Sequence, residues 1–419
     1  MPRHLVIQLA RFGDLLQSGR LIHSLLARGE THVCVDRSLA ALAGLVYPQA
    51  IVHPLLAHGT SGGGQSGLLD ANRRSLALLA KTDFDAVYNL NHSGLNRALA
   101  RLFDPSVVCG HAVRNGQNLR TRWLDLAFRW TLHRRSAPLN LVDVWASLLA
   151  DPLPPEACNP VAVPGGRGLG IVLAGRESRR SLPPEVLAPC THALFEALGG
   201  PDVHVFGSEA ERPLSRRLIR HLPAKVIERT RDHVGRTSWA DLHEGLTGLD
   251  LVFSPDTGVM HLAACVGTPV QAVFLSSAWA WETGPYGLGH RVWQADAACA
   301  PCLETAPCLA GGESAPQCLA PFRSSGFLNA LAGRRPLPED AGIWPLDSRL
   351  DALGLDWIKP SSFMDEHGRQ RLAQRALLAE YRGRDDLNSD DNPPDGSILG
   401  EIAHTFYQEA DWMLPDPLP

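Results

Sequence analysis

The stretch Ser254-Pro255-Asp256-Thr257-Gly258-Val259-Met260-His261-Leu262-Ala263-Ala264 decides the fold of this chain. It follows a largely apolar run at 249–253 that predicts a buried strand, and its small apolar residues predict a helix closed by Gly267. Asp256 or Thr257 can cap that helix, and the N–H groups of its first turn point outward with the positive end of the helix dipole. Such a terminus suits a diphosphate, although an ordinary capped helix has the same pattern.

Two further residues favour the diphosphate interpretation. Gly258 lets the backbone come close to a ligand. His261 lies one turn into the predicted helix, four residues after Thr257, so that both side chains share a face beside the same anion. The stretch therefore predicts a diphosphate site at the end of a buried strand.

A second strand-turn-helix opens the chain. The predicted short strand Leu5–Leu9 leads into Ala10-Arg11-Phe12-Gly13-Asp14, and a helical stretch follows over 15–27. The turn is neither a dinucleotide fingerprint nor a P-loop, because both glycine patterns are missing. Asp14 would lie at the helix N-terminus, where the dipole favours the ionised carboxylate and keeps it able to accept a proton. A plain N-cap without chemistry is the alternative.

Together the two turns resemble glycosyltransferase family 9, the bacterial ADP-heptose:lipopolysaccharide heptosyltransferases. The resemblance spans residues 1–330. It is carried by Arg11-Phe12-Gly13-Asp14, Gly235-Arg236-Thr237-Ser238, Asp241-Leu242, the block 256–264 with Gly267 and Pro269, and Cys299-Ala300-Pro301-Cys302. It implies an α/β protein of the GT-B type, with two Rossmann-like domains facing across a cleft. The first domain would bind the acceptor and the second the nucleotide-sugar.

Length and patterning agree with this fold. A chain of 419 residues is too long for one ordinary domain. We expect domains over 1–164 and 165–330, joined by a Pro- and Gly-rich linker at 151–166, and an acidic, partly helical extension over 331–419. Strand-like runs alternate with helical ones. The runs are Leu5–Leu9, Thr31–Val35, Ala86–Leu90, Val107–Gly110, Gly170–Ala174, Val203–Gly207, Leu249–Ser254 and Val270–Leu275.

The rest of the chain carries weaker patterns. The Gly/Ser-rich stretch 58–67 predicts a surface loop. In the extension, 336–360 is expected to be irregular, 366–381 helical, 382–396 a charged break, and 397–413 a last amphipathic helix.

Charge is unevenly spread along the chain. Lys and Arg outnumber Asp and Glu by 16 to 11 in residues 1–164, whereas the counts are 14 to 16 in 165–330 and 9 to 17 in 331–419. The first domain is therefore the basic one. The acidic total of the chain disfavours nucleic-acid binding.

The basic excess lies at 97–135, which we call the arginine segment. Its charged and aromatic residues include Arg97, Arg101, Arg114, Arg120, Arg122, Trp123, Arg129, Trp130, Arg134 and Arg135. A basic, aromatic patch suits an anionic glycolipid acceptor at a membrane surface, with Arg120 and Arg122 as contacts. A solvated helix face is the alternative.

Further donor residues follow from the resemblance. The family's phosphate-binding turn typically reads Lys-x-Trp-Pro, and here Arg180 stands in place of the Lys and Leu182 in place of the Trp. A guanidinium is always charged and can bind phosphate bidentately, whereas a surface arginine paired with Glu177 is the alternative. Glu211, in the turn after the predicted strand Val203–Gly207, resembles the residue that would accept from the ribose hydroxyls.

Acceptor contacts are expected in the first domain. Asn91 and His92 follow the predicted strand Ala86–Leu90, at an end that would face the cleft. Gly13 leaves room beside Asp14 for an acceptor hydroxyl. Polar strand ends without a binding role are common.

Two patterns raise the question of a metal. Asp83-Phe84-Asp85 has the spacing of a metal-diphosphate clamp, but it directly precedes a strand, where Asp is common in turns. The second pattern is Cys299-x2-Cys302-x5-Cys308-x9-Cys318, whose irregular spacing favours unligated thiols over a zinc or iron–sulfur site. We expect no metal and no required cofactor. Nine cysteines in a chain that we expect to stay in the cytoplasm favour thiols over disulfides.

These observations predict an inverting, metal-independent glycosyltransferase, which moves a sugar from a nucleotide donor, ADP-heptose by resemblance, to a lipopolysaccharide-core or related glycan. An in-line displacement needs a general base, here Asp14, and stabilisation of the leaving diphosphate by Arg180, His261 and backbone amides. A nucleotide-sugar epimerase of the same fold and a degenerate nucleotide-binding module are the alternatives. No apolar run is long enough to span a membrane, so we expect a cytoplasmic bacterial protein, with peripheral inner-membrane contact left open.

Overall fold

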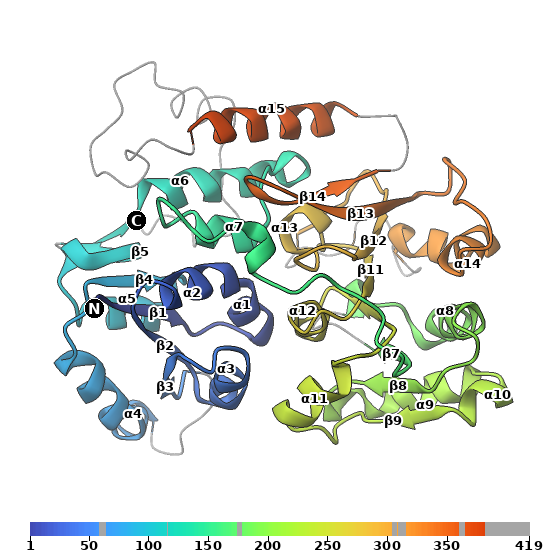
Figure 1. Ribbon diagram of the computed structural model, residues 1–419, viewed down its shortest axis with the longest axis horizontal. Helices are drawn as coiled ribbons and strands as arrows, with labels where there is room; N and C mark the ends of the chain where they lie inside the picture. Colours follow the sequence, from blue (N-terminus) through green and yellow to red (C-terminus); the bar gives the residue numbers. More distant parts are fainter. Residues whose placement is uncertain are drawn as a thin grey trace. The chain divides into compact units, whose positions relative to one another are not determined.

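The chain forms two compact units. The computed structural model describes residues 1–57, 64–114, 116–173, 178–303, 308, 316–359 and 365–381 (Figure 1). Unit 1 comprises Met1–Cys158 and the described residues after Arg371, and unit 2 comprises Asn159–Arg371. The first boundary lies inside the predicted linker, whereas the first part of the predicted extension, up to Arg371, is part of unit 2. The last predicted helix, 397–413, lies outside the described residues.

Unit 1 is built on a six-stranded sheet in the order β3-β2-β1-β4-β5-β6. All neighbouring strands are parallel except β5 and β6. The strands are β1 (Arg3–Gln8), β2 (Glu30–Asp36), β3 (Ile51–Leu55), β4 (Ala86–Asn89), β5 (Val108–Arg114) and β6 (Gln117–Arg120). β1 lies in the middle of the sheet, which is why it is buried after its first residue and has three consecutive apolar residues, Leu5 to Ile7.

Helices connect the strands of unit 1 in the β-α-β manner of a Rossmann-like fold (Figure 1). They are α1 (Phe12–Gln17), α2 (Gly19–Leu26), α3 (Ala40–Val46), α4 (Gly64–Lys81), α5 (Gly94–Ala100), α6 (Arg122–Arg129) and α7 (Leu141–Ala146). The helix predicted over 15–27 is in fact two helices that break at Ser18. The Ser18 hydroxyl donates to the carbonyls of Asp14 and Leu15, which competes with regular helical bonding.

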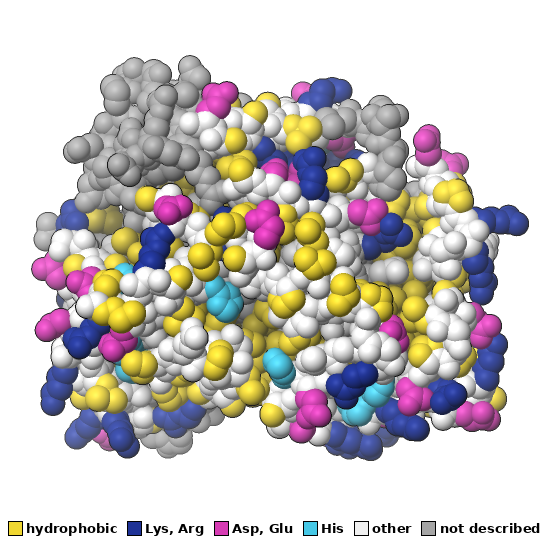
Figure 2. Space-filling model, in the orientation of Figure 1, with side chains coloured by type: hydrophobic (Ala, Val, Ile, Leu, Met, Phe, Trp, Pro, Cys, Tyr) yellow, Lys and Arg dark blue, Asp and Glu magenta, His cyan; other side chains and the backbone are white. Residues whose placement is uncertain are grey.

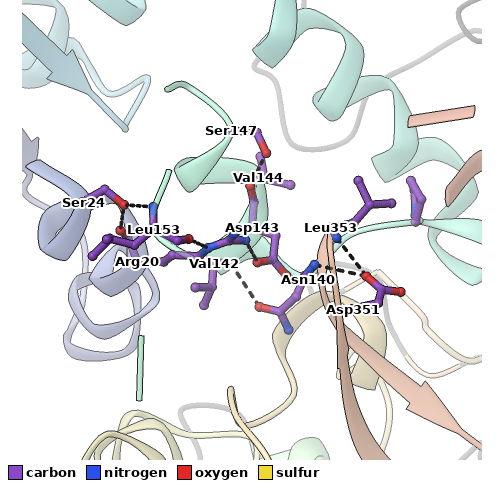
Figure 3. Close-up of polar contacts among 12 residues, drawn as sticks. Arg20, Ser24, Asn140, Val142, Asp143, Val144, Ser147, Leu153, Asp351 and Leu353 are labelled. Carbon is purple, nitrogen blue, oxygen red and sulfur yellow. Dashed lines mark hydrogen bonds and ion pairs between the residues drawn. The ribbon is translucent and has the colours of Figure 1, made fainter. Parts of the chain in front are cut away.

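A buried ion pair fixes the start of α2 inside unit 1 (Figure 3). Nη1 of Arg20 lies 2.6 Å from Oδ1 of Asp143 on α7, and neither side chain is more than 1% exposed. Nε of Arg20 donates to the Leu153 carbonyl at 2.9 Å, and the Leu153 N–H donates to the Ser24 hydroxyl at 2.9 Å. The ion pair therefore holds α2 to α7, and two hydrogen bonds with side chains of α2 hold the segment at Leu153.

Unit 2 is built on an eight-stranded sheet in the order β14-β13-β12-β11-β10-β7-β8-β9. The strands from β9 to β12 are parallel, and β13 and β14 are antiparallel to their neighbours. The strands are β7 (Leu169–Val172), β8 (Val203–Phe206), β9 (Thr230–Asp232), β10 (Leu251–Pro255), β11 (Val270–Phe274), β12 (Arg291–Ala295), β13 (Ile343–Asp351) and β14 (Gly354–Ile358).

The helices of unit 2 also follow the strands in alternation (Figure 1). They are α8 (Pro184–Ala197), α9 (Arg212–His221), α10 (Ala224–Ile227), α11 (Trp239–Leu246), α12 (Gly258–Cys265), α13 (Ala280–Thr283) and α14 (Ser325–Leu331), and α15 (Glu366–Tyr381) crosses the boundary between the units. The α/β class with two Rossmann-like units is thereby confirmed. No described helix is both long and apolar enough to cross a bilayer.

The expectation of irregular structure over 336–360 is wrong. The β13–β14 hairpin occupies most of this segment and extends the sheet of unit 2. Its turn is closed by Asp351, whose Oδ1 accepts from the N–H groups of Leu353 and Gly354, and Gly354 has a φ of 133° that favours glycine. Proline and charged residues hide the strand pattern in the sequence, because only one strand of this hairpin is largely buried.

Candidate functional site

The predicted donor residues gather where the order of the strands in unit 2 reverses. From β7 the chain proceeds to β8 and β9 on one side, and from β10 it proceeds to β11 and β12 on the other. In open α/β sheets, ligands bind at the carboxyl ends of the strands at this switch point. Arg180 comes from the connection after β7, and Asp256 directly follows β10.

Asp256 is the centre of a polar cluster at this switch point. Its side chain is only 5% exposed, and Oδ2 accepts from Nη2 of Arg180 and, at 3.0 Å, from Oγ1 of Thr283. The same Arg180 nitrogen lies 3.3 Å from the carbonyl oxygen of Asp256. A buried carboxylate is stable only when it is paired and hydrogen-bonded, and both conditions are met here. The alternative pairing of Arg180 with Glu177 cannot be compared, since residue 177 lies outside the described chain.

Thr283 did not emerge from sequence reasoning. It lies 27 residues after Asp256, on the short helix α13, and no motif marks it. Only the fold brings α13 to the switch point. A polar residue near the carboxyl end of a parallel strand is a weak signal by itself.

His261 lies beside Asp256 and belongs to the same cluster. Its Nε2 is 3.9 Å from Oδ1 of Asp256, and its side chain is 6% exposed. Burial lowers the pKa of His261 to about 4; the Asp256 carboxylate raises it and Arg180 lowers it further. The imidazole is therefore neutral near pH 7, and Arg180 supplies the positive charge of the cluster.

The start of α12 has the predicted cap. Thr257 is the N-cap, and its Oγ1 accepts from the Met260 N–H at 3.3 Å. Oγ1 of Thr257 also lies 3.2 Å from the hydroxyl of Ser254. The first-turn N–H groups, beginning at Gly258, have no carbonyl partner within the helix and carry the positive end of its dipole. Charge, dipole and hydrogen-bond donors thus coincide at the end of β10.

Glu211 lies at the carboxyl end of the neighbouring strand β8. Its Oε2 accepts from the Ser208 N–H at 2.6 Å, and burial raises the pKa of its carboxyl group. This bond closes a capping box at the short turn Glu209–Glu211. The residue at the predicted nucleoside position is thus held by its own turn.

Leu182, which takes the place of the family's Trp, is a core residue. It is 5% exposed and belongs to the apolar core of unit 2 together with residues of β7 and α8, such as Ile171 and Val186. It therefore fixes the base of the Arg180 turn by packing.

The switch point of unit 1 brings a second set of predicted residues together. The chain leaves β1 through the turn with Gly13 and Asp14, and leaves β4 through Asn91. The Leu9 N–H donates to Oδ1 of Asn91 at 3.1 Å, so the two connections are hydrogen-bonded to each other. The sequence did not show this contact between residues 82 positions apart.

Asp14 lies in the first turn of α1. Its Oδ2 accepts from the Arg11 N–H at 3.0 Å, and its carbonyl accepts from the Ser18 hydroxyl at 2.9 Å. Gln17 donates through Nε2 to the carbonyl of Gly13 at 3.4 Å. The carboxylate is half-buried and oriented by its own backbone, as a capping aspartate would be.

His92 lies next to a buried histidine. Its ring centroid is 5.7 Å from that of His111. Burial lowers the pKa of His111 to about 3, and His92 and two arginines add to the shift. A buried amide network lies beside them, in which Asn89 donates to the His111 carbonyl at 2.8 Å and Asn96 donates to Oδ1 of Asn89 at 3.0 Å.

The predicted basic, aromatic patch is only partly present. Trp123 and Trp130 are each 3% exposed and meet edge to face, so neither tryptophan is a surface residue of the arginine segment. Arg120 forms an ion pair with Asp125 at 3.0 Å and lies over the Phe128 ring. On the face drawn in Figure 2, Lys and Arg side chains lie among Asp and Glu side chains. Amphipathic packing of α6 explains Trp123, and Trp130, which directly follows α6, is buried as well.

Neither metal pattern forms a metal centre among the described residues. No group of three or more His, Cys, Asp or Glu has a metal-holding arrangement in this part of the chain. Asp85 accepts from the Arg3 N–H at 2.7 Å at the amino end of β4, the opposite edge from the switch point. Sγ of Cys302 lies 3.1 Å from Oγ of Ser276, and burial raises the pKa of Cys318.

Comparison with known proteins agrees with this fold. Residues 192–310 match the family model described as glycosyltransferase family 9 (heptosyltransferase). This match covers 119 of the 419 residues and supports a glycosyltransferase. The resemblance to family 9 is confirmed over this segment, which contains Asp256, Thr257, Gly258 and His261. Curated protein sequences give no match.

Solved structures share the fold at low sequence identity. A family 9 glycosyl transferase from Veillonella parvula is 16% identical, with a TM-score of 0.55, and the match covers 70% of this chain and 87% of that chain. ADP-heptose lps heptosyltransferase II of E. coli is 18% identical, with a TM-score of 0.55 and coverage of 79% and 99%. E. coli heptosyltransferase WaaC with ADP is 18% identical, with a TM-score of 0.54 and coverage of 70% and 93%.

Proposed function

We propose that this chain is an inverting, metal-independent glycosyltransferase that moves a sugar from an ADP-sugar to a lipopolysaccharide-core or related glycan. ADP-heptose is the proposed donor, since two proteins of the same fold are named as heptosyltransferases, one of them for ADP-heptose and the other with ADP bound. The observation that carries the proposal is the cluster of Arg180, Asp256 and His261 at the switch point of unit 2, beside the N-terminus of α12.

The leaving diphosphate is the group that this cluster suits. As the bond between the anomeric carbon and the β-phosphate oxygen breaks, negative charge collects on the diphosphate. The Arg180 guanidinium, the N–H groups of Thr257 and Gly258, and the neutral imidazole of His261 would stabilise that charge. Glu211 would accept from the ribose hydroxyls.

Asp14 is the proposed general base. Its carboxylate takes the proton of an acceptor hydroxyl while that oxygen attacks the anomeric carbon from the side opposite the diphosphate. The transfer to oxygen develops late, because a free hydroxyl is far less acidic than a carboxyl group. Gly13, Asn91, His92, Arg120 and Arg122 are the proposed acceptor contacts.

The positions of the charges support the proposed metal independence. The Asp83-Phe84-Asp85 pattern lies at the amino end of β4, in the unit that does not contain the donor cluster. Arg180 and the helix terminus offer the diphosphate positive charge that an ion would otherwise supply. We further propose a cytoplasmic location, with peripheral contact at the inner membrane where the glycolipid acceptor is found.

The decisive experiment follows the products from an ADP-sugar with and without acceptor. We expect ADP release that depends on acceptor, a product of inverted anomeric configuration by NMR, and full activity after treatment with EDTA. Sugar conversion without acceptor would establish the epimerase instead. Donor binding without turnover under any condition would establish a degenerate binding module. A thermal-shift screen of ADP-, UDP-, GDP- and CMP-sugars tests the base, because ligand at about 100 times Kd adds about 2.7 kcal/mol of stability.

A further inference from the structure

Thr283 and Arg180 share one oxygen atom of Asp256. Oγ1 of Thr283 donates to Oδ2 at 3.0 Å, and Nη2 of Arg180 donates to the same oxygen. The carboxylate is 5% exposed, whereas the Arg180 side chain is 18% exposed. The cluster therefore has a buried acceptor, a fixed hydroxyl donor, and a cation that reaches toward solvent.

The position of Thr283 is fixed by its surroundings. Its N–H donates to the Trp279 carbonyl at 3.1 Å, and the next residue, Gly284, donates to the Ala280 carbonyl at 2.8 Å. A Cβ at Gly284 would lie 2.5 Å from the ring of Trp357, a fully buried residue, so the chain passes close against this tryptophan. The hydroxyl of Thr283 is consequently presented to Asp256 from a rigid base.

This arrangement has an energetic consequence when an anion binds. If Arg180 turned its guanidinium toward a diphosphate, a buried Asp256 carboxylate without another donor would lose its partner, which is costly. Thr283 supplies a second donor to the oxygen that Arg180 would release. The hydroxyl thereby lowers the cost of sharing Arg180 between Asp256 and the ligand.

We propose that Thr283 is a positioning residue of the donor site: it holds the Asp256 carboxylate so that Arg180 can share its guanidinium with the diphosphate. The inference rests on the proposed function in one respect, which is that the ligand is a nucleoside diphosphate. Thr283 acts through Asp256 and Arg180, and the effect of its loss should depend on Arg180.

The test compares Thr283→Val, which keeps the shape and removes the hydroxyl, with Thr283→Ser, which keeps the hydroxyl. ADP and adenosine are titrated into each variant by calorimetry. We expect Thr283→Val to weaken ADP binding about tenfold, as for loss of a hydrogen bond to a charged group. Adenosine, which has no phosphate, should bind as it does to the unaltered protein, and Thr283→Ser should bind ADP within about threefold of it.

Thr191→Val is the matched control. The Thr191 hydroxyl is also buried and donates to the Leu187 carbonyl at 2.9 Å, but within α8. Its removal should change thermal stability and leave the ADP affinity unchanged. If Thr191→Val lost as much ADP affinity as Thr283→Val, the effect would come from a general weakening of unit 2, and the proposal would be overturned.

A double-mutant cycle separates positioning from direct contact. In an Arg180→Ala background, Thr283→Val should weaken ADP binding no further. If the effects of the two substitutions on ADP binding are fully additive, the proposal is overturned. An unchanged ADP affinity in Thr283→Val alone would also overturn it. Neither result would contradict the proposed transferase activity. If the unaltered protein binds no nucleoside diphosphate, the proposed function fails and the positioning role fails with it.

Discussion

Nε2 of His261 faces Oδ1 of Asp256 across 3.9 Å, and both side chains are more than nine-tenths buried. Despite this carboxylate, burial keeps the pKa of His261 at about 4. The protein thus carries a neutral imidazole and a guanidinium at the end of β10, and only the guanidinium is charged at neutral pH. This division makes Arg180 the residue on which diphosphate affinity should depend most.

Stability should fall as the pH drops from about 6.5 toward 4. Burial lowers the pKa values of His53, His261 and His290 to about 4 in the folded chain, below the ordinary value of 6.5. Between these values the unfolded chain binds more protons than the folded chain, so protons favour unfolding. Each such histidine should lower the free energy of unfolding by roughly 2 kcal/mol at pH 5 relative to pH 7. Urea unfolding at both pH values measures the difference.

His290→Gln offers a control for that prediction. It removes one titrating group at the amino ends of β11 and β12, whereas Asp256 follows the carboxyl end of β10, and it should make the stability less dependent on pH over the same range. A slope that remains the same would assign the acid sensitivity to other groups.

Replacing Arg180 should weaken ADP binding. Arg180→Lys keeps the charge and loses the planar fork, so we expect about a tenfold rise in Kd, whereas Arg180→Ala should give a larger rise. Arg229→Ala is the control, because Arg229 also pairs with an aspartate, Asp202, but is 59% exposed. Calorimetry with ADP measures the Kd of the three variants. If all three bind ADP with equal affinity, Arg180 is not part of the donor site.

Asp14→Asn should abolish most of the transfer without loss of donor binding. Asparagine keeps an oxygen that can accept from the Arg11 N–H, but it cannot take a proton from the acceptor. General-base loss typically costs roughly 10²–10⁴-fold in kcat. The ADP Kd should not change, because the donor cluster belongs to unit 2.

Asp85→Asn is the matched control for the base. Asp85 also accepts from a backbone N–H, that of Arg3, in the same unit. It should retain near-normal kcat. If Asp14→Asn did the same, Asp14 would be a helix cap only.

Charge reversal in the arginine segment should raise the acceptor KM and leave kcat intact. Arg120→Glu and Arg122→Glu would repel an anionic acceptor, and the KM of the unaltered protein should rise with salt, since exposed charges are screened beyond about 8 Å at physiological ionic strength. Arg73→Glu, at an arginine that is 82% exposed on α4, is the control. If the acceptor KM changes with neither salt nor charge reversal, the arginine segment is a solvated face and does not bind the acceptor.

The sequence predicted those strands whose burial is accompanied by a run of apolar residues. β1, β7 and β10 are central strands that are almost wholly buried, and their Leu, Val and Ile runs are plain. β9 has only three residues, all of them polar, and β3 contains Pro54, so neither produced a strand signal.

The site was predicted where it depends on local turns. The cap at Thr257 and the position of Asp14 follow from a few neighbouring residues. The bond between Asn91 and Leu9, like that between Thr283 and Asp256, joins distant parts of the chain, and only the strand order decides it. The two tryptophans of the arginine segment were misplaced for the same reason, because residue type alone does not tell which side chains of α6 and of the turn after it are covered.

The buried pair of Arg20 and Asp143 places a constraint on how this protein can change over evolutionary time. Loss of either residue alone would leave its partner charged and sealed from water, at a cost of about 3–5 kcal/mol, which is a large part of the stability of an ordinary domain. An apolar pair of similar volume can be just as stable, but it requires both substitutions. Among descendants of this sequence we therefore expect the two positions to change together, because a substitution at one is tolerated only when the other is substituted as well.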